Sequence, residues 1–213
     1  MKKAIALLTM LASLACMSQT VTTGNKLAIS HGDMTLYPSN DTLPMVSVHK
    51  IRFSKFKLDS DREDRWFQEK YKKVSKAPYK GTGYDLGHLT PAHITSYDDS
   101  LNYNSFSLYN QAPQVARFNR KEWRMLEAAV EDTILKYKKD AVVITGVVYD
   151  PNSKDVLPGS RIKIPAFYFT SVYVGAKTYC WIGKNDKTGE IKIVSLQELN
   201  AIFEKNKMFL KIR

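Results

Sequence analysis

The sequence predicts a single α+β domain built on a central, mainly antiparallel sheet. Several apolar, β-branched runs are typical of strands, above all the continuous run from Ala141 to Tyr149. The segment from Asn119 to Lys138 instead carries apolar residues at steps of three and four, which predicts a long helix packed by one face. The 213 residues are 44% hydrophobic, enough for a sizeable core, and show no repeat or internal domain boundary.

The first 18 residues have the pattern of a secretory signal peptide. Lys2 and Lys3 precede an apolar run that ends in small residues and is too short to span a bilayer. Cys16 follows a partial match to a lipid-attachment motif, so a cleaved soluble form and a lipid anchor at Cys16 both stay open. Residues 19–32 show little pattern and are expected to form a flexible leader before one domain over residues 33–213. We therefore expect export through the secretory pathway of a bacterium, to a periplasmic, secreted or lipid-anchored location.

The chain is basic, with a formal net charge of +11 at pH 7. Loss of residues 1–18 would remove Lys2 and Lys3 and no acidic residue, which leaves 11 − 2 = +9. Such a surplus attracts polyanions, although many exported proteins are basic too. Cys180 lies in an apolar run and is expected to be a small core residue. No internal disulfide is expected, whether or not Cys16 is retained.

The first half of the domain is expected to begin with strands at Asp33 to Tyr37 and Met45 to Phe53, separated by a turn-rich segment. His49 alternates with Val48 in the second strand and is expected to be structural. Residues 57–80 are polar and irregular, with one helical turn expected near residues 64–70. Lysines and aromatic residues mix over residues 50–80, which would suit a basic wall beside a substrate, although a solvated surface explains most of the lysines and core packing most of the aromatic residues.

A histidine in a short glycine-containing turn is the first residue with chemical potential. His88 follows Asp85 and Gly87, and glycine allows a backbone conformation or close approach that a Cβ would obstruct. Asp85 could orient the imidazole or cap the turn. His93, five residues later, could suggest a paired metal site, but no cysteine or second acidic ligand stands at a zinc spacing, which argues against zinc.

The next residues lead into the long helix. Ser105 to Tyr109 predicts a short strand, which Asn110, Pro113 and Gln114 then end. The helix is expected to begin near Asn119, where an asparagine is also the ordinary N-cap residue.

Three residues of this helix lie along one flank. Asn119, Trp123 and Glu127 stand four residues apart, so an amide oxygen and a carboxylate rise beside a buried edge. Such oxygen ligands suit Mg²⁺, which keeps most of its waters. A histidine nearby could deprotonate a water and direct it at phosphorus, so the pattern predicts a small hydrolytic site.

The second half of the domain is expected to complete the sheet. Arg161 to Val174 and Lys177 to Ile182 predict two strands joined in a hairpin around Gly175, after a turn-rich excursion at residues 151–160. Ser195 to Asn206 predicts a terminal amphipathic helix.

Two blocks of sequence identify a family resemblance. The patterns D-x-G-H-L-x-P-A and N-x-x-P-Q-x-x-x-x-N-x-x-x-W-x-x-L-E resemble the DNA/RNA non-specific endonucleases of the ββα-metal superfamily. The resemblance implies a ββα-metal finger that carries the active site. By the same resemblance His88 would be the general base, Asn119 the direct Mg²⁺ ligand (Mn²⁺ is possible), and Glu127 a water-mediated support of the ion. Asn110 and Gln114 would shape the substrate site.

Three positions depart from the family pattern. Leu86 replaces an arginine of the D-R-G-H motif, Glu131 an arginine one turn after the helix glutamate, and Thr170 a lysine. Three other arginines are near enough in sequence to serve as substitutes, and the first two are the candidate substrate-binding residues: Arg117, Arg120 and Arg124.

The sequence thus predicts an exported Mg²⁺-dependent hydrolase that cuts phosphodiester bonds of DNA and RNA without strong sequence specificity. The family resemblance implies products with 5′ phosphates. No protein partner is implied. The alternative is a catalytically weakened nucleic-acid-binding protein on the same fold, which the lost positive charges favour. A surface lipoprotein with a protein partner would rest on Cys16 and the basic charge alone.

Overall fold

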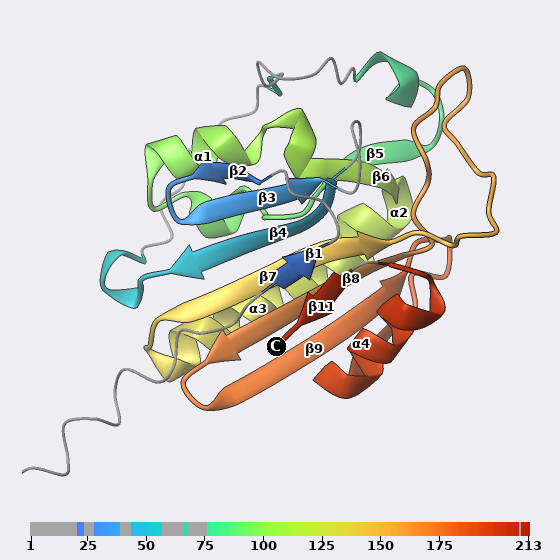
Figure 1. The fold of residues 1–213 in the computed structure, drawn as a ribbon. Coiled ribbons are helices and arrows are strands. Elements are labelled where there is room, and N and C mark those ends of the chain that lie inside the picture. Colours follow the sequence, from blue (N-terminus) through green and yellow to red (C-terminus); the bar gives the residue numbers. More distant parts are fainter. Residues whose placement is uncertain (1–20, 24–27, 39–43, 57–65, 68–75, 209) are drawn as a thin grey trace, which may run out of the picture.

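The computed structural model describes residues 21–23, 28–38, 44–56, 66–67, 76–208 and 210–213. Within these ranges the centre is a seven-stranded antiparallel sheet of order β10-β9-β8-β7-β4-β3-β2 (Figure 1). The strands are β2 Ile29–His31, β3 Met34–Pro38, β4 Pro44–Ile51, β7 Ala141–Val148, β8 Phe167–Val174, β9 Lys177–Lys184 and β10 Ile191–Val194. The predicted α+β fold with a central antiparallel sheet is confirmed.

One face of the sheet is covered by the long helix. Its regular part, α3 Arg124–Tyr137, follows the short helix α2 Ala116–Phe118 and a π-helical turn, η5 Asn119–Trp123. Figure 1 shows α3 behind β7 and β8. The buried residues at this interface include Leu126, Val130 and Ile134 of α3 and Val143, Val147 and Val172 of the sheet.

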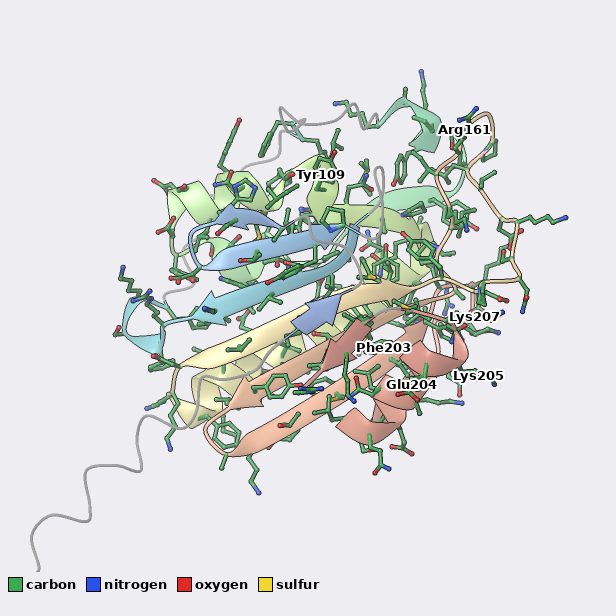
Figure 2. All side chains as sticks on the ribbon, viewed as in Figure 1. Tyr109, Arg161, Phe203, Glu204, Lys205 and Lys207 are labelled. Atoms are coloured by element: carbon green, nitrogen blue, oxygen red, sulfur yellow. The ribbon has the colours of Figure 1, made fainter. Side chains whose placement is uncertain are left out.

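The opposite face of the sheet is covered by α4 Leu196–Lys205 and by a two-stranded pair, β1 Val21–Thr23 with β11 Leu210–Ile212 (Figure 1). Phe203 is buried between α4 and the sheet, whereas Glu204 is exposed (Figure 2). Because both faces are covered, β7 is buried at every position, which explains its continuous apolar run rather than an alternating one.

A smaller two-stranded sheet lies beside this sandwich. It pairs β5 Tyr84–His88 with β6 Gln111–Val115 in antiparallel register. Between the two strands the chain forms helix α1 Asp99–Ser105 and the 3₁₀ turns η3 His93–Thr95 and η4 Leu108–Asn110. Two further 3₁₀ turns are η1 Phe53–Lys55 and η2 Ala77–Tyr79.

Several predicted boundaries were wrong. The strand expected at Ser105 to Tyr109 is instead a helix end and a 3₁₀ turn, and the strand follows at Gln111–Val115. The strand expected over Arg161 to Val174 begins only at Phe167, because Pro165 lies in the run and cannot donate a ladder hydrogen bond. The strand β10 had not been predicted.

The predictions for the N-terminal region have mixed outcomes. Within the expected flexible leader, residues 21–23 and 29–31 form strands. The signal peptide and Cys16 lie outside the described residues, as does most of the helical turn expected at residues 64–70. No helix in the described ranges combines the length and the apolar character that crossing a membrane would require.

Candidate active site

His88 is the last residue of β5, so the expectation that it lies in a short glycine-containing turn was wrong. The β5–β6 ladder sets His88 opposite Gln111 and Gly87 opposite Ala112. Gly87 is needed for close approach: a Cβ there would lie 2.6 Å from the Cβ of Gln114 and 2.8 Å from the hydroxyl of Tyr168. β5 can therefore pack closely against Gln114 and Tyr168, and this close packing sets the position of His88, the next residue.

Two aromatic rings hold the imidazole of His88. The Trp66 ring lies 4.5 Å away, centroid to centroid, at an interplanar angle of 36°. Phe106 meets the imidazole edge-on at 4.9 Å and 88°. Apolar contacts on two sides restrict the rotation of the imidazole, so its orientation is set before any substrate binds.

Asn119 lies inside the helical segment rather than at its start. The helix begins at Ala116 with Val115 as its N-cap, so the N-cap interpretation of Asn119 was wrong. Asn119 opens the π-helical turn, a local widening of the helix that is frequent at functional sites. Its amide is therefore not used in capping and can serve another purpose.

Asp85 fastens the start of this helix to β5. Its Oδ2 accepts a hydrogen bond of 2.9 Å from Asn119 Nδ2. Arg120 donates to both carboxylate oxygens, from Nε at 2.9 Å and from Nη2 at 2.7 Å, and this pairing raises the pKa of Arg120. Because the Asn119 nitrogen is engaged, its Oδ1 is the atom left to accept from, or to ligate, something else.

A cavity of about 750 Å³ lies between β5, the helical segment and the sheet. His88, Asn119 and Glu127 all line it, so the structure brings the three predicted chemical residues to one place. Arg120 and Arg124 line it as well, whereas Arg117 is not among the described residues that do. Arg117 instead donates to the Lys187 carbonyl and pairs with Glu122 at 3.0 Å.

Asn110 and Gln114 are fully buried and are not among the described residues that line the cavity, so neither is placed to contact a substrate directly. Asn110 Nδ2 donates to the carbonyls of Thr90 at 2.8 Å and Ser105 at 2.7 Å, and its Oδ1 accepts from Thr90 N at 2.9 Å. Asn110 thus holds the chain just after His88. Neither amide atom of Gln114 has a hydrogen-bond partner among the described residues.

The three positions that depart from the family pattern all line the cavity. Glu131 pairs with His93, with Nε2 and Oε2 3.2 Å apart. Burial raises the pKa of Glu131, and the neighbouring His93 opposes that rise. Thr170 is buried beside Thr145, with 3.0 Å between the two hydroxyl oxygens. Leu86 packs against a separate apolar cluster.

The sequence reasoning missed Trp66 and the pair of Glu131 with His93. Trp66 gave no specific signal, since an aromatic residue in a lysine-rich segment is more often a core residue. For Asp85 the carboxylate was noticed, but its partners lie 34 and 35 positions away, beyond any local pattern.

The donors present fit a hard, oxygen-seeking ion. Asn119 and the half-buried Glu127 line the same cavity, and Mg²⁺ needs few protein ligands because it keeps its waters. Among the residues that the structure describes, no three His, Cys, Asp or Glu side chains cluster as a dedicated metal cage would require. The set is thus unlike a zinc site and compatible with Mg²⁺.

Comparisons with known proteins agree with this picture. The sequence model of the DNA/RNA non-specific endonucleases matches residues 15–205. Human mitochondrial endonuclease G is 26% identical over 136 residues, which are 57% of this chain and 46% of that protein. Nuclease 1 of Schizosaccharomyces pombe is 28% identical over 140 residues, covering 60% of this chain and 41% of that protein.

A crystal structure of the EndoG/EndoGI complex is similar in fold. It superposes with a TM-score of 0.67 at 21% identity, over 82% of each chain. This chain spans less than half the length of the two relatives named above. The family match nevertheless extends over most of its residues. The chain belongs to the DNA/RNA non-specific endonuclease family.

Proposed function

We propose that this protein hydrolyses phosphodiester bonds of DNA and RNA in a Mg²⁺-dependent reaction without strong sequence preference. One observation carries the proposal: His88, Asn119 and Glu127 line a single cavity, in which Asp85 fixes the orientation of the Asn119 amide. Family membership supports the same reaction class.

His88 is the general base of this proposal. Its imidazole, held between Trp66 and Phe106, accepts a proton from a water molecule, and that water attacks phosphorus. Restricted rotation matters because a proton acceptor must lie within hydrogen-bond distance of the water while the bond to phosphorus forms.

Asn119 Oδ1 and Glu127 are the residues that would hold Mg²⁺, with Mn²⁺ as a possible replacement. When bound, such an ion supplies positive charge that stabilises the phosphorane-like transition state and the leaving 3′ oxygen. Asp85 contributes by holding the Asn119 nitrogen, which leaves the amide oxygen of this cavity-lining residue to act as the ligand.

The lack of sequence preference would follow from what the site can recognise. Contacts to phosphate and sugar carry no base information, and a basic chain attracts any polynucleotide.

The second candidate is a nucleic-acid-binding protein on the same fold with weakened catalysis. It is favoured by Leu86, Glu131 and Thr170, which leave three cavity-lining positions without the positive charge that the family pattern carries there.

Plasmid cleavage separates the two candidates. Protein lacking residues 1–18 should nick supercoiled DNA in Mg²⁺, stop when EDTA is added, and lose most of its activity in Asn119→Ala. Binding of DNA without Mg²⁺-dependent nicking would favour the second candidate. Equal nicking in EDTA would overturn the metal-dependent mechanism.

Export, with or without a lipid anchor at Cys16, is proposed from the first 18 residues alone. It would bring the enzyme to nucleic acids outside the cytoplasm.

A further inference from the structure

Three arginines near the start of the long helix could supply positive charge to a phosphate, and their partners distinguish them. Arg117 is tied to the Lys187 carbonyl and to Glu122, and is not among the described residues lining the cavity. Arg120 lines the cavity, but both carboxylate oxygens of Asp85 accept its hydrogen bonds. Its guanidinium charge is already balanced within the protein.

Arg124 differs from both. It lines the cavity, it is exposed, and it forms no ion pair with a carboxylate among the residues that the structure describes. It is the first residue of α3, immediately after the π-helical turn. Side chains on a helix lean toward its N-terminus, so Arg124 extends over the turn that holds Asn119 and Arg120.

Of the three carboxylates that line the described cavity, two pair with cations within the protein, and the third, Glu127, is the one assigned to the metal in the proposed function. Asp85 pairs with Arg120, and Glu131 with His93. No lysine is among the lining residues in the described part of the chain. Arg124 is therefore the one lining arginine, within that described part, whose charge stays available to an anion.

We propose that Arg124 contacts the non-bridging oxygens of the phosphodiester in the cavity and supplies positive charge in place of the three cations that the family pattern carries at positions 86, 131 and 170. This inference rests on the proposed function. A planar guanidinium can donate two parallel hydrogen bonds to a phosphate. Arg124 can do so without first breaking an ion pair to a carboxylate of the described residues.

The test compares Arg124→Ala and Arg124→Lys with Arg117→Ala, a charge-matched control on the same helical segment. Alanine favours the helix at both positions, and circular dichroism and thermal unfolding check that the variants fold. Cleavage of a fluorescent DNA oligonucleotide is measured at saturating and subsaturating substrate. Binding of a single-stranded oligonucleotide in EDTA is measured by anisotropy over a series of salt concentrations.

Arg124→Ala is expected to lower kcat by about 10- to 100-fold, as expected for loss of a contact that strengthens in the transition state. Arg124→Lys should recover only part of that loss. The magnitude of the slope of log K against log salt should fall in Arg124→Ala by the amount that corresponds to about one phosphate contact. The slope should stay unchanged in Arg117→Ala.

If Arg124→Ala behaves like Arg117→Ala in both cleavage and salt dependence, the assignment of Arg124 is wrong. If the wild-type protein does not cleave at all, the proposed function fails instead. In that case the binding series still decides whether Arg124 contacts phosphate.

Discussion

Two groups of cavity-lining residues are built in opposite ways. In the first group, the Asp85 carboxylate accepts hydrogen bonds from Asn119 and Arg120, and two aromatic rings contact His88. In the second group, Glu131 is partly buried and pairs with His93, whose side chain is exposed on η3. The first group orients its polar side chains and leaves the Asn119 amide oxygen available. In the second group the two charged side chains pair with each other. This difference supports the proposal that the chemistry belongs to the first group.

Asp85→Asn should have the largest effect on the first group of residues, because it disturbs Asn119 and Arg120 and leaves His88 unchanged. Removing the carboxylate charge frees Arg120 and lets the Asn119 amide rotate, so we expect cleavage to fall by about 10- to 100-fold, in line with loss of a residue that orients a metal ligand. The Mg²⁺ concentration for half-maximal rate should rise. A Mg²⁺ titration of the initial rate measures both effects.

The control for Asp85→Asn is Asp132→Asn, which makes the same change at an exposed carboxylate on α3. Similar rates for Asp85→Asn, Asp132→Asn and the wild type would mean that Asp85 does not organise the site.

Glu131→Gln tests the second group of residues, and its expected effect is smaller and falls on the stability of the folded protein. Burial raises the folded-state pKa of Glu131, so the folded protein binds this proton more readily than the unfolded chain does. That contribution to stability is present below the ordinary carboxyl range and is lost as the pH rises through the folded-state pKa.

Glu131→Gln carries no ionisable group at this position and should therefore melt at a higher temperature than the wild type near pH 7, and the gap should shrink as the pH falls into the ordinary carboxyl range. Thermal unfolding across this range measures it, with the exposed Glu204→Gln as control. A lower melting temperature for Glu131→Gln at pH 7 would show that the pair with His93 outweighs the effect of burial.

The fold was largely predictable where pattern and burial agree. β7 is a continuous apolar run because both faces of the sheet are covered, and α4 carries the capping box of Ser195 and Glu198. β6 escaped prediction because it is buried without being apolar: its sequence is QAPQV. Pro113 argues against a central strand, but β6 pairs only with β5 in the described sheet, so a proline is tolerated there.

The site was predictable only where its residues are close in sequence. Asn119 and Glu127 share a helix, and their spacing alone predicts that they lie on one flank. The bond from Asn119 to Asp85 joins strand and helix across 34 positions, and the π-helical turn that presents Asn119 leaves no mark in the sequence pattern. The spacing of His88 and His93 likewise does not show that both line one cavity with different partners.

The most direct test of this account compares those two histidines, which line the same cavity five residues apart. His88→Ala should lower the Mg²⁺-supported cleavage rate by about 10²- to 10⁴-fold, as loss of a general base does, while binding of DNA at low salt changes little. His93→Ala should stay within about threefold of the wild type, because it removes only the partner of Glu131. A loss of rate in His93→Ala as large as that in His88→Ala, with both proteins folded, would contradict the assignment of the chemistry to the group that contains His88 and Asn119.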